Sequence, residues 1–367
     1  MNVEPLRREV WADLAGRVPD RFLSPFQLPP WMDFQLRTLP RAEDCSLSFR
    51  FSDGAVAAVP IVKTRHRLGH ASYASLAEDQ YGGPLSDRAL TDDELKSVYG
   101  YLARHVTPIR VTLTPTLSEA GEPPVDERWK MDPATCHLLA LPQTYEEWFT
   151  KTASESCRRA IRRATRSKLT VSRTKATADL EAYYHLYQSS AARWGKKAAE
   201  LHPRTYFGSL LACPLSCLYV VYKDSAPAAG MITLESSNCT IYYLGATDLS
   251  FSLLRPADFG LSEVIRDSIA NRRAILNLGA SLGMPALEQF KEKFGAVKRP
   301  YATYFTQDFW SSSYRSYAYY RSVLRRRLDG VAQALRDRTR PDIPSGTADS
   351  PAATPGSAPG VGGDEER

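Results

Sequence analysis

The residues of this chain best suited to bind an anion are five arginines in one short segment, which are Arg158, Arg159, Arg162, Arg163 and Arg166. In a helix of 3.6 residues per turn they fall within an arc of about 140°, and small apolar residues occupy the other side. Guanidinium groups bind phosphates in bidentate fashion, so this face suits a phosphate-bearing ligand. A face solvated by water and counterions is the alternative. We take Arg158, Arg162 and Arg163 as the candidate phosphate-binding residues.

A lysine near the end of a predicted helix is the second candidate for chemistry. The segment Phe290–Gly295 reads FKEKFG. Phe290 and Phe294 are four residues apart and share one helix face, with Lys291 at its edge. Lys291 and Lys293 are predicted to point in different directions. A partly desolvated lysine at such an edge can stabilise an anionic intermediate. Spacing alone favours the alternative, a surface lysine that flanks two core phenylalanines.

The sequence lacks the residue sets typical of metal sites and of covalent catalysis. Cys213 and Cys217 are close, but no second cysteine pair or nearby histidine pair completes a zinc set. His66 and His70 lie in an arginine- and glycine-rich stretch that reads as a solvated loop. No Ser-His-Asp or Cys-His set is evident, so the residues do not favour a covalent enzyme intermediate. We therefore expect reduced, mostly buried thiols, no metal and no cofactor.

The net charge of +6 is concentrated in two segments. Residues 151–173 hold eight basic residues and one acid, and residues 311–340 hold eight arginines and two acids. The second segment interleaves its arginines with tyrosines, a combination that can hold single-stranded nucleic acid. A helix docked by its tyrosines, with the arginines outward, is the alternative that we favour. Residues 341–367 contain no aromatic residue and are predicted to be disordered.

The remaining patterns predict a mixed α/β protein of two domains. Helices are expected over residues 5–18, 91–105, 144–168, 178–194, 203–212, 256–271, 285–294 and 313–335. Strands are expected over residues 46–51, 55–62, 72–76, 109–114, 137–141, 169–175, 215–222, 228–234, 239–245, 274–278 and 301–305, and residues 115–132 read as a polar connection. The charged N-terminus has no signal-peptide core, and no stretch is long and apolar enough to span a membrane, so a cytoplasmic protein is expected.

An ordered series of segments in the second half resembles the FemABX-like group. The series runs from the arginine helix through Tyr242–Asp248 (YYLGATD), Arg255-Pro256 and Leu276–Ser281 (LNLGAS) to Phe290–Gly295 (FKEKFG). FemABX-like proteins are transferases of the GNAT superfamily (acyl-CoA N-acyltransferase-like) that add amino acids from aminoacyl-tRNA to peptide or peptidoglycan precursors. The resemblance covers roughly residues 145–305. The first half shows weaker similarities to the group, at Pro25-Phe26-Gln27 with Trp31 and at Tyr81–Pro84.

The resemblance implies two tandem GNAT-like domains, over residues 1–135 and 136–310, followed by a basic helix (311–340) and a disordered tail. It implies that Lys291 stabilises charge during acyl transfer and that Tyr243 or Tyr242 helps to line the acceptor site. Trp31 and Tyr81 become candidate substrate-binding residues.

Two departures from related families bear on the donor. No segment between Leu169 and Ser216 is long enough for the helical arm of many tRNA-dependent Fem enzymes. Acetyl-CoA-binding GNAT proteins hold a pyrophosphate on the amides of a glycine-rich turn, whereas residues 254–260 read LRPADFG and lack those glycines. We therefore expect an N-acyltransferase that uses aminoacyl-tRNA and a peptide or small-molecule acceptor. An acyl-CoA-dependent enzyme and a non-catalytic RNA-binding protein on the same fold are the alternatives.

Overall fold

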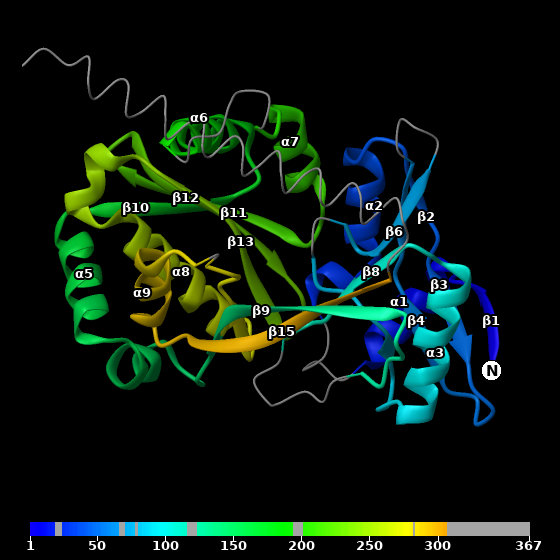
Figure 1. Cartoon of the computed structure of the whole chain (residues 1–367). Helices are drawn as coiled ribbons and strands as arrows, with labels where there is room; N and C mark the ends of the chain where they lie inside the picture. Colours follow the sequence, from blue (N-terminus) through cyan, green and yellow to red (C-terminus); the bar gives the residue numbers. More distant parts are fainter. Residues whose placement is uncertain are drawn as a thin grey trace, which may run out of the picture. The chain divides into compact units, whose positions relative to one another are not determined.

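Helices flank two β-sheets in the computed structural model of the protein, which describes residues 1–18, 24–65, 70–77, 80–115, 123–193, 201–281 and 283–306 (Figure 1). This mixed architecture confirms the predicted α/β fold class. The predicted basic helix (311–340) and disordered tail (341–367) lie outside the described residues.

Nine α-helices are present among the described residues. They are α1 (Arg8–Arg17), α2 (Pro29–Thr38), α3 (Asp92–His105), α4 (Tyr145–Glu147), α5 (Glu155–Arg166), α6 (Thr177–Arg193), α7 (Arg204–Ala212), α8 (Pro256–Ala270) and α9 (Pro285–Glu292). Three further turns are η2 (Pro25–Gln27), the π-helical η3 (Trp148–Thr152) and η5 (Leu249–Leu254). The predicted helix over residues 144–168 is therefore interrupted, because Ser154 begins a new helix by accepting a hydrogen bond from the Cys157 amide.

The strands form a four-stranded sheet in the order β1-β3-β4-β7 and an eleven-stranded sheet in the order β10-β11-β12-β13-β14-β9-β15-β8-β6-β5-β2. Their bounds are β1 (Asn2–Pro5), β2 (Ala42–Asp44), β3 (Leu47–Arg50), β4 (Val56–Val59), β5 (Val62–Arg65), β6 (Ala71–Ser75), β7 (Leu85–Ser86), β8 (Ile109–Thr112), β9 (Trp129–Ala140), β10 (Leu169–Thr174), β11 (Ser216–Lys223), β12 (Ala226–Glu235), β13 (Cys239–Thr247), β14 (Ile275–Asn277) and β15 (Val297–Thr306).

The long antiparallel pair of β9 and β15 joins the strands of the first half to those of the second half. Figure 1 shows this pair running between the two parts of the larger sheet. The expectation that residues 115–132 form only a connection is wrong at its end, because β9 already begins at Trp129. The predicted division at residue 135 falls inside β9, and the two-domain boundaries stay a prediction.

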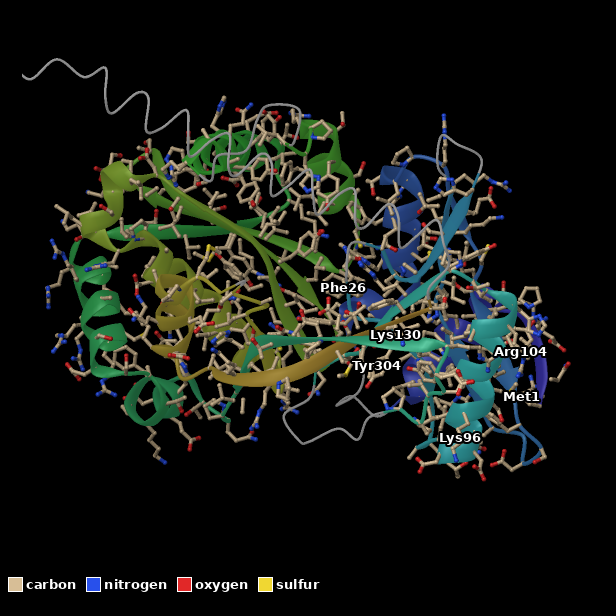
Figure 2. The ribbon with its side chains drawn as sticks, in the orientation of Figure 1. Met1, Phe26, Lys96, Arg104, Lys130 and Tyr304 are labelled. Atoms are coloured by element: carbon tan, nitrogen blue, oxygen red, sulfur yellow. The ribbon has the colours of Figure 1, made fainter. Side chains whose placement is uncertain are left out.

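Helix α3 illustrates how local sequence signals fix an element. The Thr91 hydroxyl accepts from the Glu94 amide at 3.3 Å, and the Glu94 carboxylate accepts from the Thr91 amide at 2.8 Å. This reciprocal pair satisfies two amides that a helix start would otherwise leave unbonded. Leu102 faces the core, whereas Lys96 and Arg104 extend from the exposed side of α3 (Figure 2).

The parallel strands β13 and β14 separate at one end, and this split positions the candidate site. They pair only from Cys239 with Ile275 to Ile241 with Asn277, after which β13 continues beside β12 alone. Helix α8 connects the two strands, so its first residues follow the carboxyl end of β13. The carboxyl ends of parallel strands, where neighbouring strands part, are the usual place for a ligand.

Candidate functional site

A basic cavity of about 560 Å³ lies on the arginine face of α5. Its lining residues are Ser156, Arg159, Ala160, Arg162, Arg163, Arg166, Arg255 and Lys293. Six of these eight side chains are cations, and none of the lining residues in the described structure is acidic. Arg255 precedes α8 and Lys293 follows α9, so three separate elements supply the positive charge.

The cavity contains two of the three arginines predicted to bind phosphate, Arg162 and Arg163, but Arg158 is not among its lining residues. The Arg158 guanidinium instead donates to the backbone oxygens of Thr150 and Ala153, at 3.0 and 2.8 Å. A cation at this place stabilises the end of the preceding helical turn.

Most of the cavity arginines have no carboxylate partner within the described part of the chain. Arg162 lies 3.8 Å from a Glu155 oxygen, whereas no described carboxylate forms an ion pair with the other four arginines. Those four are Arg159, Arg163, Arg166 and Arg255. Unpaired guanidinium groups repel one another, so an anion in this cavity lowers their mutual repulsion.

Arg255 occupies a backbone conformation that ordinarily favours glycine, with φ 62° and ψ 45°. It ends η5, where its amide donates to the Ser252 oxygen at 3.1 Å, and it directly precedes Pro256 at the start of α8. For a residue with a Cβ atom the left-handed region costs roughly 1–2 kcal/mol. The protein therefore places an arginine where a glycine would fit with less strain.

Lys293 contributes to the cavity from a second direction. Its ammonium forms an ion pair with Asp258 in the first turn of α8 and lies 4.6 Å from the centre of the Phe290 ring. Lys291 points elsewhere, so the prediction that these two lysines diverge is confirmed.

Lys291 is buried, with 4% of its surface exposed, so the surface position favoured by spacing alone is wrong. Its ammonium donates to the backbone oxygens of Gly279 and Ala280, at 2.9 and 2.8 Å. Burial lowers the pKa of Lys291 to about 8 from its ordinary 10.5, against smaller opposing effects of Cys136 and Glu288. The Lys291 ammonium is therefore a buried donor, held by the loop that directly follows β14.

The loop that binds the Lys291 ammonium is fixed by β9. The amide of His137 donates to the Gly279 oxygen at 3.1 Å, and its ring nitrogen Nδ1 lies 3.3 Å from the Ser281 hydroxyl. Burial, and then the charge of Lys291, lower the pKa of His137, which keeps the ring neutral. Gly279 adopts φ 70°, which a glycine tolerates.

Tyr81 connects this loop to the first half of the chain. Its hydroxyl lies beside the side chains of Asn277 and Cys136, and burial raises its pKa well above the ordinary value. Burial also raises the pKa of the Cys136 thiol to about 12, which disfavours the thiolate. Cys136 is therefore unsuited to act as a nucleophile.

An aromatic cluster places Tyr243 next to the predicted residues of the first half. The Trp31 ring meets the Tyr243 ring edge-on at 5.5 Å, and Phe26 lies 5.1 Å from Trp31 and 5.8 Å from Tyr81. The Tyr243 hydroxyl lies 2.8 Å from the Tyr206 hydroxyl. Trp31 is fully buried and packs directly on Tyr243, whereas Tyr81 is nearly buried and meets Phe26, which in turn contacts Tyr243 at 6.0 Å.

Tyr242 and Tyr243 are separated by a β-bulge. Leu244 pairs with Ile232 and Tyr242 pairs with Thr233, which leaves Tyr243 as the extra residue of β13. Tyr242 packs in the core beneath α5 and α8, and burial raises its pKa to about 12. Of the two tyrosines, Tyr243 is the one beside Trp31.

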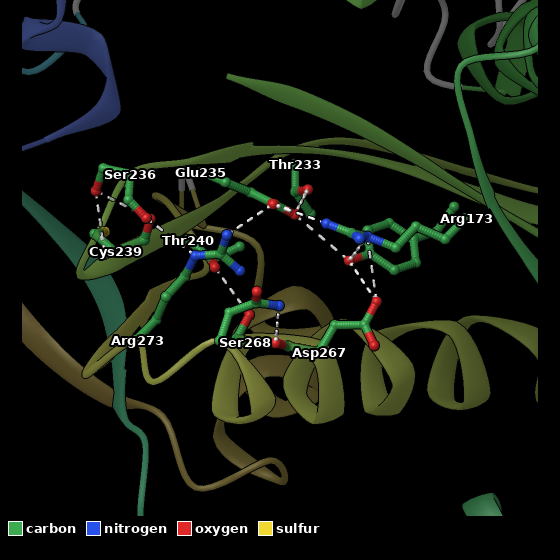
Figure 3. A network of polar contacts seen from close by, with 11 residues as sticks. Arg173, Thr233, Glu235, Ser236, Cys239, Thr240, Asp267, Ser268 and Arg273 are labelled. Carbon is green, nitrogen blue, oxygen red and sulfur yellow. Dashed lines mark hydrogen bonds and ion pairs between the residues drawn. The ribbon is translucent and has the colours of Figure 1, made fainter. Parts of the chain in front are cut away.

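In a second charged cluster, in contrast to the cavity, arginines are paired with carboxylates (Figure 3). Glu235 accepts from Arg173 at 3.1 Å and from Arg273 at 2.9 Å. Asp267 accepts from the Tyr219 hydroxyl at 3.0 Å. These bonds tie β10, β11 and β12 to the end of α8, so the cluster reads as structural.

Four cationic residues of the cavity were not among the site residues predicted from the sequence: Arg159, Arg166, Arg255 and Lys293. The helical projection already contained a signal for Arg159 and Arg166, whereas Arg255 and Lys293 enter from other elements. In the part of the chain that is described, no group of three or more histidine, cysteine, aspartate or glutamate side chains can hold a metal ion. No described helix is long and apolar enough to cross a membrane.

Comparisons with known proteins bear on the fold. Residues 151–292 match the family model of the acetyltransferase (GNAT) domain. FemX superposes with a TM-score of 0.60 at 11% identity, over 82% of this chain and 97% of that chain.

Two further structures have similar folds. A conserved protein of unknown function from Bacteroides thetaiotaomicron VPI-5482 gives a TM-score of 0.53 at 9% identity, over 83% of this chain and 100% of that chain. The C-terminal domain (DUF2156) of a putative lysylphosphatidylglycerol synthetase from Agrobacterium fabrum gives 0.52 at 11% identity, over 82% and 93%. No curated protein matches the chain in sequence. The chain thus has a FemABX-like GNAT fold, as its sequence motifs predicted.

Proposed function

We propose that this chain, which has the fold of a GNAT acyltransferase, transfers an aminoacyl group from aminoacyl-tRNA to an amine. The acceptor amine belongs to a peptide, a cell-wall precursor or a small metabolite. The observation that carries the choice of donor is the basic cavity, with six cations from three elements. A nucleic acid end presents the repeated phosphates that such a surface suits.

The turn before α8 also favours this donor over acyl-CoA. Pro256 has no amide hydrogen, and the residues around it lack the glycines of a pyrophosphate-binding turn. Phosphate binding by arginine side chains takes the place of binding by backbone amides in this proposal.

Lys291 supplies the charge stabilisation in the proposed reaction. The acceptor amine attacks the ester carbonyl carbon, a C–N bond forms, the ester C–O bond breaks, and the proton lost by the amine goes to the departing ribose oxygen. Lys291 has three N–H donors, of which the Gly279 and Ala280 oxygens take two, so one is left for the oxyanion. One such donor is worth about 3 kcal/mol.

Tyr243 orients the reacting groups in this proposal, because its hydroxyl is held by Tyr206 and its ring by Trp31. Trp31 and Tyr81 act as positioning residues, because Trp31 packs on Tyr243 and Tyr81 packs on Phe26, which also contacts Tyr243. Arg162 and Arg163 hold donor phosphates, and Arg158 orders the start of α5 that presents them.

Two other functions fit the fold. An acyl-CoA-dependent N-acyltransferase uses the same GNAT core, and a non-catalytic RNA-binding protein uses the cavity without Lys291. The proposed function differs from both because it requires an intact RNA donor and the lysine.

The purified chain, incubated with a pool of charged tRNA and candidate amines, tests the proposal. We expect amide products by mass spectrometry that disappear when ribonuclease is added before the enzyme. Product formation from acyl-CoA after complete removal of RNA would assign the acyl-CoA function instead. Full cellular function of a Lys291→Ala variant would assign the non-catalytic one.

A further inference from the structure

We propose that Arg255 is a phosphate-contacting residue, and that the basic cavity takes the single-stranded end of an RNA by its successive phosphates. This inference rests on the aminoacyl-tRNA donor proposed above and assigns the contacts at that site. It follows from three observations: the length of the row of cations, the lack of a described carboxylate partner for four of the five cavity arginines, and the strained backbone of Arg255.

The row of cations is too long for one pyrophosphate. Arg159 and Arg166 both line the cavity and are seven residues apart on α5, which corresponds to about 10 Å along the helix axis. The two phosphorus atoms of a pyrophosphate share one bridging oxygen and span much less. A strand with a phosphate at every nucleotide can engage the whole row.

Arg255 approaches this row from another element. It is exposed, lines the cavity and forms no ion pair with a described carboxylate. Its left-handed backbone persists although glycine would remove the strain, and strain of this kind is commonly retained where a side chain has a function. A guanidinium there and the guanidinium groups of α5 reach the same bound strand.

Arg272 provides an internal comparison. It also has a positive φ, of 58°, it is exposed, and it follows the other end of α8. Arg272 is not among the residues that line the cavity. Replacement of either arginine by glycine removes one positive charge and relieves one strained residue, but only Arg255 is placed to contact the ligand.

The test is a fluorescence anisotropy titration of the full chain with a labelled single-stranded RNA dodecamer that ends in CCA, at several KCl concentrations. For Arg255→Gly we expect about tenfold weaker binding, the loss typical of one charge-assisted hydrogen bond. The slope of log Kd against log salt falls by about 0.7. The melting temperature of Arg255→Gly is equal to or above that of the wild type. Arg255→Ala shows the same loss of binding without the gain in stability.

The control Arg272→Gly keeps a Kd within about twofold of the wild type, since only a general charge effect remains. Equal weakening by Arg255→Gly and Arg272→Gly overturns the inference, as does a wild-type Kd for Arg255→Gly. Displacement of the RNA by equimolar coenzyme A assigns the cavity to that ligand and also overturns it.

The outcome is separable from that of the proposed function. If no ribonuclease-sensitive product forms, but Arg255→Gly still weakens RNA binding as expected, only the proposed reaction is refuted. Transfer that depends on Lys291, with an Arg255→Gly variant that binds RNA normally, refutes only this inference.

Discussion

Replacement of Lys291 by methionine removes the ammonium and keeps an unbranched side chain of similar length. In the folded chain, burial holds the pKa of Lys291 at about 8, and the ordinary value is 10.5. A difference of about 2.5 units corresponds to about 3 kcal/mol. Between pH 8 and pH 10.5 the unfolded chain binds a proton that the folded chain has lost. The free energy of unfolding of the wild type therefore rises with pH in this window.

At pH 7 two effects of Lys291→Met oppose each other. The variant avoids the cost of the buried charge, about 3 kcal/mol. It leaves the Ala280 oxygen without a donor, at about 1–3 kcal/mol, and the Gly279 oxygen with only the His137 amide. The two proteins should unfold with similar free energies there. By pH 10.5 the wild type gains up to about 3 kcal/mol relative to the variant.

Urea unfolding followed by tryptophan fluorescence, from pH 7 to pH 10.5, measures this difference. Ionisation of tyrosines and other groups affects both proteins and cancels when the variant is subtracted. A difference in unfolding free energy that stays constant over the whole range would show that Lys291 is not held as a desolvated ammonium, and the reasoning would fail.

Two further substitutions separate activity from stability. Tyr243→Phe keeps the ring but removes the hydroxyl bonded to Tyr206. The rate of transfer should fall strongly, while the free energy of unfolding in urea falls by only about 1 kcal/mol. Equal activity of the variant and the wild type would exclude a role for the hydroxyl. Gly295→Ala forces a Cβ to within 2.3 Å of Thr152 at a φ of 89°, and should destabilise by roughly 2–4 kcal/mol in the same assay. Its control is Gly208→Ala, which meets nothing within 4 Å on α7 and should not destabilise.

Most helices and strands could be predicted because their signals are local. Thr91 with Glu94 marks the start of α3, and Pro256 marks the start of α8. The first part of β9 carried no such signal, because residues 130–133 are exposed and show no alternation of buried and exposed side chains. Its extended form comes from pairing with β15, which lies more than a hundred residues further along the chain.

The candidate site could be predicted only in part, for the same reason. The helical projection of α5 predicted Arg162 and Arg163 as a phosphate-binding face, and the motif around Lys291 indicated the lysine. The burial of Lys291 depends on the Gly279 loop and on His137 of β9, which no local pattern connects to it. The contribution of Arg255 depends on how α8 packs beside α5.

The role of Lys291 is tested most directly by single-turnover transfer from one purified aminoacyl-tRNA to an accepting amine, with the wild type and Lys291→Met side by side at pH 7. We expect a rate constant roughly 100- to 1000-fold lower for the variant, as for loss of one oxyanion donor, with RNA binding unchanged. Equal rate constants for the two proteins would contradict the central role of Lys291.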